Sequence, residues 1–216
     1  MSQNLLVTAA PARAPLLARL IRHAESAANA GAPTADPASI PLTVRGEEQA
    51  HAISLAFAAA PELIVCSPFL RVRQTAAPTV ARFAAVPVQT WPIEEFTYLS
   101  PPRCAHTTAE QRQPWVAAYW QAADPHAVDG LGAESFAAFV GRVQAAHDRL
   151  TALPVASVAV FGHGQFMLAL RWWMTESPAT IDADAMRAFR AFNLAHPIAN
   201  GGGFSMAHDG RAWSLA

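Results

Sequence analysis

An arginine and a histidine stand together where a short apolar run ends. Residues 16–21 are long enough for one buried strand, and Arg22 and His23 follow directly. In open α/β sheets, ligands bind just beyond the carboxyl ends of the strands, where this pair would lie. A guanidinium can hold two oxygens of a phosphate while an imidazole attacks or stabilises the phosphorus. The alternative is a surface Arg-His pair at a strand end, and other parts of the chain decide between the two.

Two further strands are predicted to end in polar residues of the same kind. Residues 155–161 form an apolar run that leads to His163 and Gly164. Residues 63–66 stop at a Ser-Pro pair, and Arg71 follows one helical turn later. Neighbouring parallel strands lie roughly 5 Å apart, so the three strand ends can converge on one small anion. A helix that begins at Gly164 would add backbone N–H groups and the positive end of its dipole to the binding of this anion.

Strands and helices alternate along most of the chain. The hydrophobic pattern predicts strands over residues 16–21, 63–66, 86–91 and 155–161, helices that follow Thr43 and Pro68, further helices over residues 110–121, 135–153, 165–174 and 183–192, and a hairpin over residues 203–215. Pro78 is expected to kink or restart the second helix. Alternation of this kind is typical of a mostly parallel sheet with helices on both faces. We therefore expect an α/β fold, a three-layer α/β/α sandwich with a mostly parallel central sheet.

One long stretch breaks this alternation. Residues from about 92 to 132 are rich in proline and aromatic side chains, and we expect an inserted, lid-like segment that could cover a site. Its aromatic residues Trp115, Tyr119 and Trp120 are expected to form the core of this segment rather than a platform for a substrate. Arg103 is expected to be a surface charge, with the alternative that it reaches a substrate from the insertion.

Composition and charge exclude several classes of function. A net charge of −1 over 216 residues gives no electrostatic reason to expect nucleic acid or an anionic membrane as a partner. All 15 basic residues are arginines, so a lysine nucleophile or Schiff base is impossible. Cys66 and Cys104 make neither a disulfide framework nor a zinc site. No histidine outside the strand ends has a partner at ligand spacing, so we expect no metal and no cofactor.

The composition and the hydrophobic pattern also predict how the chain is organised. Apolar residues make up 52% of it, which is enough for a sizeable core. We expect residues 1–14 to form a flexible N-terminal arm and residues 15–216 a single domain. No stretch approaches the ~18 apolar residues of a membrane span, and the start lacks the pattern of a signal peptide. We therefore expect a cytoplasmic protein, and the sequence leaves the oligomeric state open.

Four short motifs follow one another in an order that is specific to one family. They are Arg22-His23-Ala24-Glu25-Ser26 with Asn29, Leu42-Thr43 with Gly46 and Gln49-Ala50, Ser67-Pro68 with Arg71 and Gln74-Thr75-Ala76, and His163-Gly164. A Gly-Ala-Glu-Ser element at residues 132–135 and Asn200 ahead of the last strands add to the pattern. One such motif is weak, whereas four in order over about residues 16–208 are specific. On these residues the chain resembles the histidine phosphatase superfamily, also called phosphoglycerate mutase-like.

The resemblance implies a role for each matching residue. His23 would attack the phosphorus and carry a phosphohistidine intermediate. The equatorial oxygens, where negative charge concentrates in the transition state, would be held by Arg22, Arg71 and His163. Asn29 would either add a hydrogen bond on the phosphate side or stabilise its own loop.

The family also uses an acid, usually a glutamate after the third strand, to protonate the leaving oxygen and later to activate water. Glu94 and Glu95 both stand at this place, and the family's spacing points to Glu95. The alternative for either residue is a solvated loop carboxylate. Ala24 is the chief departure, because most members have glycine there and use its carbonyl to orient the imidazole. Alanine still provides this carbonyl, and it forbids few backbone conformations unless φ is positive.

The function implied is hydrolysis of a small phosphomonoester by a metal-independent histidine phosphatase, with the phosphohistidine on His23. The expected partner is therefore a small phosphorylated molecule. A phosphoglycerate mutase is one alternative, but residues 95–100 lack the Glu-Arg-His-Tyr-Gly stretch of that group. A non-catalytic sensor of phosphorylated ligands is another, and loss of His23, Arg71 or His163 would have indicated it. All three are present.

Overall fold

The central sheet has six strands in the part of the chain that the structure, a computed structural model, describes, residues 15–216. They are β1 (Leu16–Arg22), β2 (Leu63–Cys66), β3 (Val88–Thr90), β4 (Ser157–Gly162), β5 (Gly203–His208) and β6 (Trp213–Leu215), in the spatial order β3-β2-β4-β1-β5-β6. The first four strands run parallel, and β5 is antiparallel to both β1 and β6. The expected α/β fold with a mostly parallel sheet is confirmed. The predicted arm, residues 1–14, lies outside the described residues.

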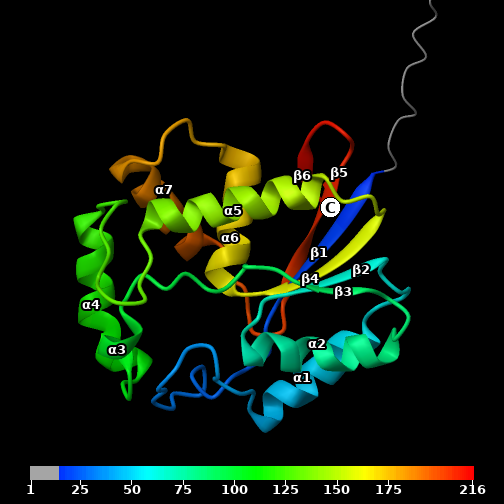
Figure 1. The fold of residues 1–216 in the computed structure, drawn as a ribbon, viewed down its shortest axis with the longest axis horizontal. Coiled ribbons are helices and arrows are strands. Elements are labelled where there is room, and N and C mark those ends of the chain that lie inside the picture. The colour runs from blue at the N-terminus through cyan, green and yellow to red at the C-terminus, as the bar shows by residue number, and fades with distance from the viewer. Residues whose placement is uncertain (1–14) are drawn as a thin grey trace, which may run out of the picture.

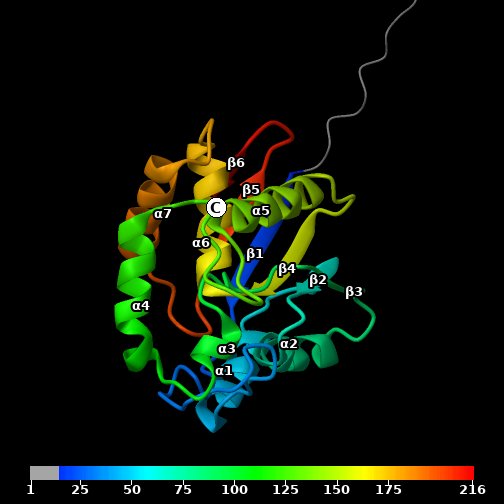
Figure 2. The same ribbon diagram turned by 60° about the vertical axis from the view of Figure 1, so that its left-hand side comes forward.

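Helices cover both faces of this sheet and complete the three layers (Figure 1). One face carries α1 (Val44–Leu55) and α2 (Leu70–Arg82), and the other carries α5 (Phe136–Thr151) and α6 (Gly164–Glu176), with α7 (Ala183–Ala195) packed against α6. The two remaining helices, α3 (Pro101–Cys104) and α4 (Ala109–Ala122), stand apart from the sheet on the side where β1 ends (Figure 2). Among residues 15–216, no helix combines the length and the apolar character needed to cross a membrane.

The strands divide their side chains between two apolar clusters, as the alternation along a strand requires. Leu20 of β1 and Val160 of β4 belong to the larger cluster, under α5 and α6. Ile21 and Phe161, one position further along each strand, belong to the smaller cluster under α1 and α2. The sheet is therefore fixed from both sides, and the directions in which its strand ends point are fixed with it.

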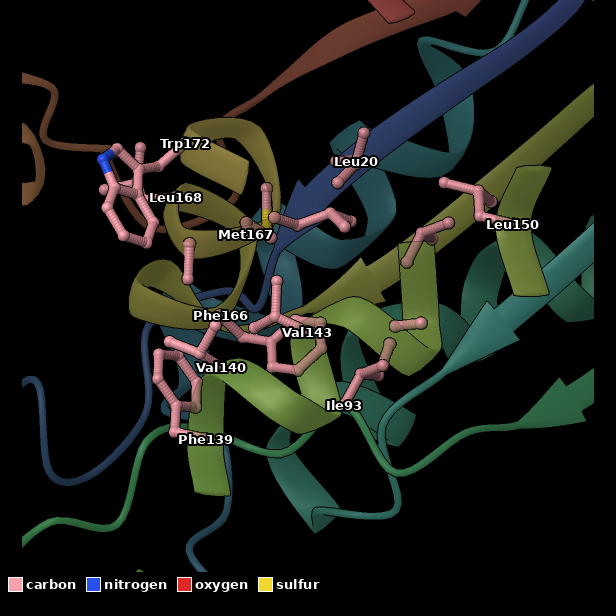
Figure 3. Packing of buried hydrophobic residues seen from close by; sticks show 14 of the residues in the cluster. Leu20, Ile93, Phe139, Val140, Val143, Leu150, Phe166, Met167, Leu168 and Trp172 are labelled. Atoms are coloured by element: carbon pink, nitrogen blue, oxygen red, sulfur yellow. The ribbon is translucent and has the colours of Figure 1, made fainter. Parts of the chain in front are cut away.

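The larger cluster is formed by close packing of two amphipathic helices on the sheet (Figure 3). Phe139, Val140 and Val143 of α5 face Phe166 and Met167 of α6, and all five side chains are buried. Burying a side chain of this size stabilises the fold by about 1.5–3 kcal/mol. This packing holds α6 in place, and the first residues of α6 lie next to the candidate site.

Helix starts are fixed by side chains that accept hydrogen bonds from the first turn. Thr43 caps α1 by accepting from the N–H of Gly46, and Ser135 caps α5 in the same way. The helix after Pro68 does not restart at Pro78, since α2 runs without interruption through this residue. The carbonyl of Pro78 accepts a hydrogen bond from Ser54 of α1, so packing between the two helices holds the helical course there.

β3 has only three residues where six were predicted, and the irregular stretch follows it from residue 91, close to the expected start. A helix predicted over residues 110–121 is present as α4. Trp120 is buried in the larger cluster, and Tyr119 packs against it. A single bridge joins Thr34, in the loop after β1, to Thr107 in this stretch. Two segments far apart in the sequence are thereby linked beyond the end of β1.

Candidate active site

The register of the sheet brings three strand ends to one place. Arg22 pairs with Gly162 across β1 and β4. The ladder continues one step further, because the N–H of His23 donates to the carbonyl of Gly162 at 2.9 Å. On the other side of β4, the N–H of Ser67 donates to the carbonyl of Phe161 at 3.1 Å. The residues that follow β1, β2 and β4 are therefore neighbours at the carboxyl edge of the sheet.

Arg71, from the first turn of α2, lies between the two histidines of this edge. Its Nε donates to Nε2 of His23 at 3.2 Å, and its Nη2 donates to Nδ1 of His163 at 3.1 Å. Its Nη1 donates to the carbonyl of Pro37 at 2.6 Å. The two imidazole rings are 5.3 Å apart, and all three side chains are buried. The structure thus gathers one guanidinium and two imidazoles in a volume that suits a phosphate.

The imidazole of His23 has a defined orientation. Its Nδ1 lies 2.8 Å from the carbonyl oxygen of Ala24, while Nε2 accepts from Arg71. The proton therefore belongs on Nδ1, and Nε2 keeps its lone pair. Burial and the charges of Arg71 and Arg22 lower the pKa of His23 to about 3. At neutral pH the ring is uncharged, which is the form that can act as a nucleophile.

Ala24 replaces the usual glycine without backbone strain. Positive φ angles at non-glycine residues occur, within residues 15–216, only at His106, Ala123 and Ser177. The N–H of Ala24 donates to Oγ1 of Thr75 at 3.0 Å, and the side chain is fully buried. The carbonyl that orients His23 is thus held by the chain around it, and a methyl group is accommodated at this position.

The second histidine is fixed in the opposite tautomer. Because Nδ1 of His163 accepts from Arg71, its proton belongs on Nε2, which lies 2.9 Å from Oγ of Ser67. Burial, followed by the charge of Arg71, holds the pKa of His163 well below its usual value. Neither Ser67 nor Thr75 was predicted as a site residue, although both lie in the third motif and that motif was the available signal.

Arg22 lies beside His23, Arg71 and His163, and the segment between α7 and β5 holds its guanidinium. Its Nη1 donates to the carbonyl of Ile198, and its Nε is buried without a hydrogen-bond partner among the described residues. Gly164 borders this guanidinium, since a Cβ there would be in van der Waals contact with Nε at 3.4 Å. Burial lowers the pKa of Arg22, and the charge of Glu95 opposes this shift.

Glu95 occupies the start of α6. Its carboxylate accepts from the N–H groups of Gln165, at 3.1 Å, and Phe166, at 3.2 Å. The N–H groups that were expected to bind an anion at this helix start are thus directed at a carboxylate of the protein itself. Burial lowers the pKa of Arg71 to about 10, with Glu95 opposing, so this carboxylate also acts on the central guanidinium.

The neighbouring carboxylate faces another way. Oε2 of Glu94 lies 3.4 Å from Nη1 of Arg142, and Nη2 of the same arginine pairs with Glu134. Glu95, by contrast, lines the same cavity as Arg71. The two candidate acids are adjacent in the sequence, but only Glu95 lines that cavity.

Asn29 lies in a small hydrogen-bond network behind the histidine. Its Oδ1 accepts from the N–H and Oγ of Ser26, at 3.1 and 2.8 Å, and from Nδ2 of Asn200 at 3.0 Å. Nδ2 of Asn200 also donates to the carbonyl of His23 at 3.2 Å. The two asparagines therefore join the loop after β1 to the segment before β5.

A cavity of about 200 Å³ leads from Arg71 and Glu95 toward the insertion. Its other walls come from residues 28–40, from Phe69 and from residues 96–116. Arg103 is exposed, which confirms the expected surface charge, and it pairs with Asp129 and lies over the ring of Trp115. It does not line this cavity, whereas Arg112 does.

Fold and site together define an α/β protein with a two-histidine, arginine-centred pocket at the carboxyl edge of a mostly parallel sheet. The sequence model of the histidine phosphatase superfamily (branch 1) matches residues 19–196, and the chain belongs to this superfamily. A comparison with curated proteins finds no significant match. Among the described residues, no group of three or more His, Cys, Asp or Glu side chains could hold a metal ion.

Several solved structures share this fold. An alpha-ribazole phosphatase from Shigella flexneri is 21% identical, with a TM-score of 0.70 over 93% of this chain and 95% of that one. A mycobacterial glucosyl-3-phosphoglycerate phosphatase is 19% identical, with a TM-score of 0.68 over 93% and 97%. A phosphoserine phosphatase from Entamoeba histolytica is 18% identical, with a TM-score of 0.69 over 93% and 95%. At these identities the likeness shows the fold.

Proposed function

We propose that the protein is a phosphatase that hydrolyses a small phosphomonoester through a phosphohistidine on His23. One observation carries this proposal: the carbonyl of Ala24 fixes the proton of His23 on Nδ1, which leaves the Nε2 lone pair facing Arg71. The similar proteins described above are phosphatases by name, which supports the same reaction class. A small phosphorylated molecule is the proposed partner.

In the first half of the reaction, Nε2 of His23 forms a bond to phosphorus as the bond to the ester oxygen breaks. Phosphate oxygens replace the two imidazoles as hydrogen-bond acceptors of Arg71, and His163 and Arg22 complete the binding of the equatorial oxygens. Charge on these oxygens is stabilised by donors that are already in place, which is the main source of acceleration in phosphoryl transfer. Glu95 gives a proton to the leaving oxygen, so that the alcohol departs neutral.

In the second half, water attacks the phosphohistidine. Glu95, now a carboxylate, takes a proton from the water as the bond from phosphorus to Nε2 breaks. Orthophosphate forms, His23 regains its lone pair, and Glu95 is protonated for the next cycle. The N–H groups at the start of α6 keep the carboxylate in one position through both halves. This geometry is the reason to assign the acid to Glu95 rather than to Glu94.

The experiment that tests the function is a screen of phosphomonoesters with the purified protein, phenyl phosphate included, with release of orthophosphate as the readout. A phosphoenzyme that is stable to base and labile to acid should be detected by mass spectrometry during turnover. If no phosphomonoester releases phosphate and no phosphoenzyme forms, the proposal is wrong.

Glu95→Gln should slow the hydrolysis of alkyl phosphates by about 10²–10⁴ and that of activated aryl phosphates much less. An alkoxide needs a proton in order to leave, whereas a weakly basic phenolate departs without help. The measurement is kcat/KM for an alkyl and a nitrophenyl phosphate in each variant. Glu94→Gln is the matched control and should show no dependence on the leaving group. The reverse pattern would move the role to Glu94.

The reaction is proposed to proceed without a metal, and activity should therefore survive incubation with EDTA unchanged. The reason is that guanidinium and imidazole groups supply the donors for all the equatorial oxygens. Initial rates before and after chelation, and after addition of Mg²⁺ or Zn²⁺, check this expectation. Loss of activity on chelation together with recovery on adding a metal would contradict it.

A further inference from the structure

Arg112 is a charged side chain in a mostly apolar part of the cavity that begins at Arg71 and Glu95. It comes from α4 of the insertion, whereas Arg71 and Glu95 lie at the sheet edge. The cavity therefore joins the proposed phosphate pocket to a cation on a different segment. The walls between are mainly apolar and include Phe69, Leu99 and Val116; these three belong to no step of the proposed reaction.

The guanidinium of Arg112 is fixed in place but not neutralised. Its Nη1 donates to the carbonyl and to Oγ1 of Thr107, at 2.9 and 3.1 Å. Among residues 15–216, no carboxylate lies within ion-pair distance of it. The other arginines of this region differ, since Arg103 pairs with Asp129 and Arg142 with Glu134. In the described part of the chain, Glu95 is the one carboxylate on the walls of the cavity, and the proposed reaction already uses it.

Arg112 is half-buried and is held by one nitrogen, so the N–H groups of Nε and Nη2 have no hydrogen-bond partner among the described residues and are left for a ligand. These two donors form a planar fork that matches the two oxygens of a carboxylate. The cavity volume of about 200 Å³ can be compared with the ~150 Å³ of an apolar cavity that holds benzene. One ring with a short side chain would fill such a space.

We propose that Arg112 determines specificity by binding a carboxylate on the alcohol part of the substrate, which is otherwise apolar. The substrate class is then a phosphomonoester with a carboxylate at the end remote from the phosphate. This inference rests on the proposed phosphatase function for the position of the phosphate. It rests on the cavity for the positions of the apolar part and the carboxylate.

The test uses a matched pair of aryl phosphates, 3-(4-phosphonooxyphenyl)propanoate and its primary amide. They have the same ring and the same leaving group and differ in charge at the far end. Wild-type protein should show a kcat/KM for the carboxylate about tenfold or more above that for the amide. In Arg112→Gln this ratio should fall to about one, and any general loss of activity cancels within the ratio. Arg103→Gln removes a charge from the same segment and should keep the wild-type ratio.

A binding measurement separates this inference from the reaction itself. Titration calorimetry with the unphosphorylated alcohols, 3-(4-hydroxyphenyl)propanoate and its amide, should show the carboxylate binding about tenfold more tightly to wild type, with the preference lost in Arg112→Gln. If phenyl phosphate is hydrolysed but wild type prefers neither member of either pair, Arg112 is not a carboxylate site and the phosphatase function stands. If no phosphate ester is hydrolysed but the binding preference depends on Arg112, the carboxylate site stands and the proposed function fails.

Discussion

His23→Ala should reduce phosphate release from every substrate that the wild type accepts by about three orders of magnitude or more. Its imidazole is the proposed attacking group, so the variant retains only the positioning of the phosphate by Arg71, Arg22 and His163. The phosphoenzyme should also disappear from the mass spectrum. A variant that only bound its substrate more weakly would still form the phosphoenzyme at saturating substrate. Rates of orthophosphate release and intact-protein mass measure both effects.

A matched control is His51→Ala. His51 is an exposed residue of α1, and it makes no contact with the candidate site. This variant should keep wild-type turnover and a wild-type phosphoenzyme. Turnover of His23→Ala within a few-fold of wild type would rule out covalent catalysis through this histidine.

Arg71→Lys should lower kcat/KM by about 10²–10³ although the positive charge is kept. In the structure the three guanidinium nitrogens donate in three directions, to His23, to His163 and to Pro37. An ammonium is a compact point charge on a flexible stem, so it cannot reproduce three N–H donors in fixed directions around a phosphate. The measurement is kcat/KM for phenyl phosphate, together with the inhibition constant of orthovanadate.

The same helix offers the control for this second substitution. Arg73 lies two residues further along α2 and is exposed. Arg73→Lys should leave both constants at the wild-type value. Near-normal rates and vanadate inhibition in Arg71→Lys would show that this guanidinium does not hold the phosphate.

The central part of the fold could be predicted from the sequence because its signals are local. The apolar runs of β1, β2 and β4 each end at a polar residue, and the sheet places the ends of adjacent parallel strands side by side. His23 and His163 are neighbours in the structure for this reason. The stripe of α5, with Phe139 and Val143 on its inner face, followed from helical periodicity in the same way.

What could not be predicted depends on how separate segments pack together. The position of Glu95 against the start of α6 is set by the path of the chain after β3, which has no periodic pattern. The same holds for Arg103 on α3 and Arg112 on α4, because the packing of these two helices decides which arginine faces the cavity. Both arginines belong to the insertion, and in the structure Arg103 pairs with Asp129 whereas Arg112 lines the cavity.

The position of β1 in the sheet has a consequence for how the molecule folds. This strand is the first of the described strands, yet the strands on both sides of it, β4 and β5, belong to the last third of the chain. Contacts between such distant segments form only after large loops have closed, which slows folding. During synthesis both edges of β1 must stay unpaired until most of the chain has emerged, and unpaired strand edges favour aggregation. His23 is therefore one of the last residues to reach its final surroundings as the molecule folds. Because slow pairing of β1 favours aggregation, heterologous expression at low temperature should raise the yield of folded protein.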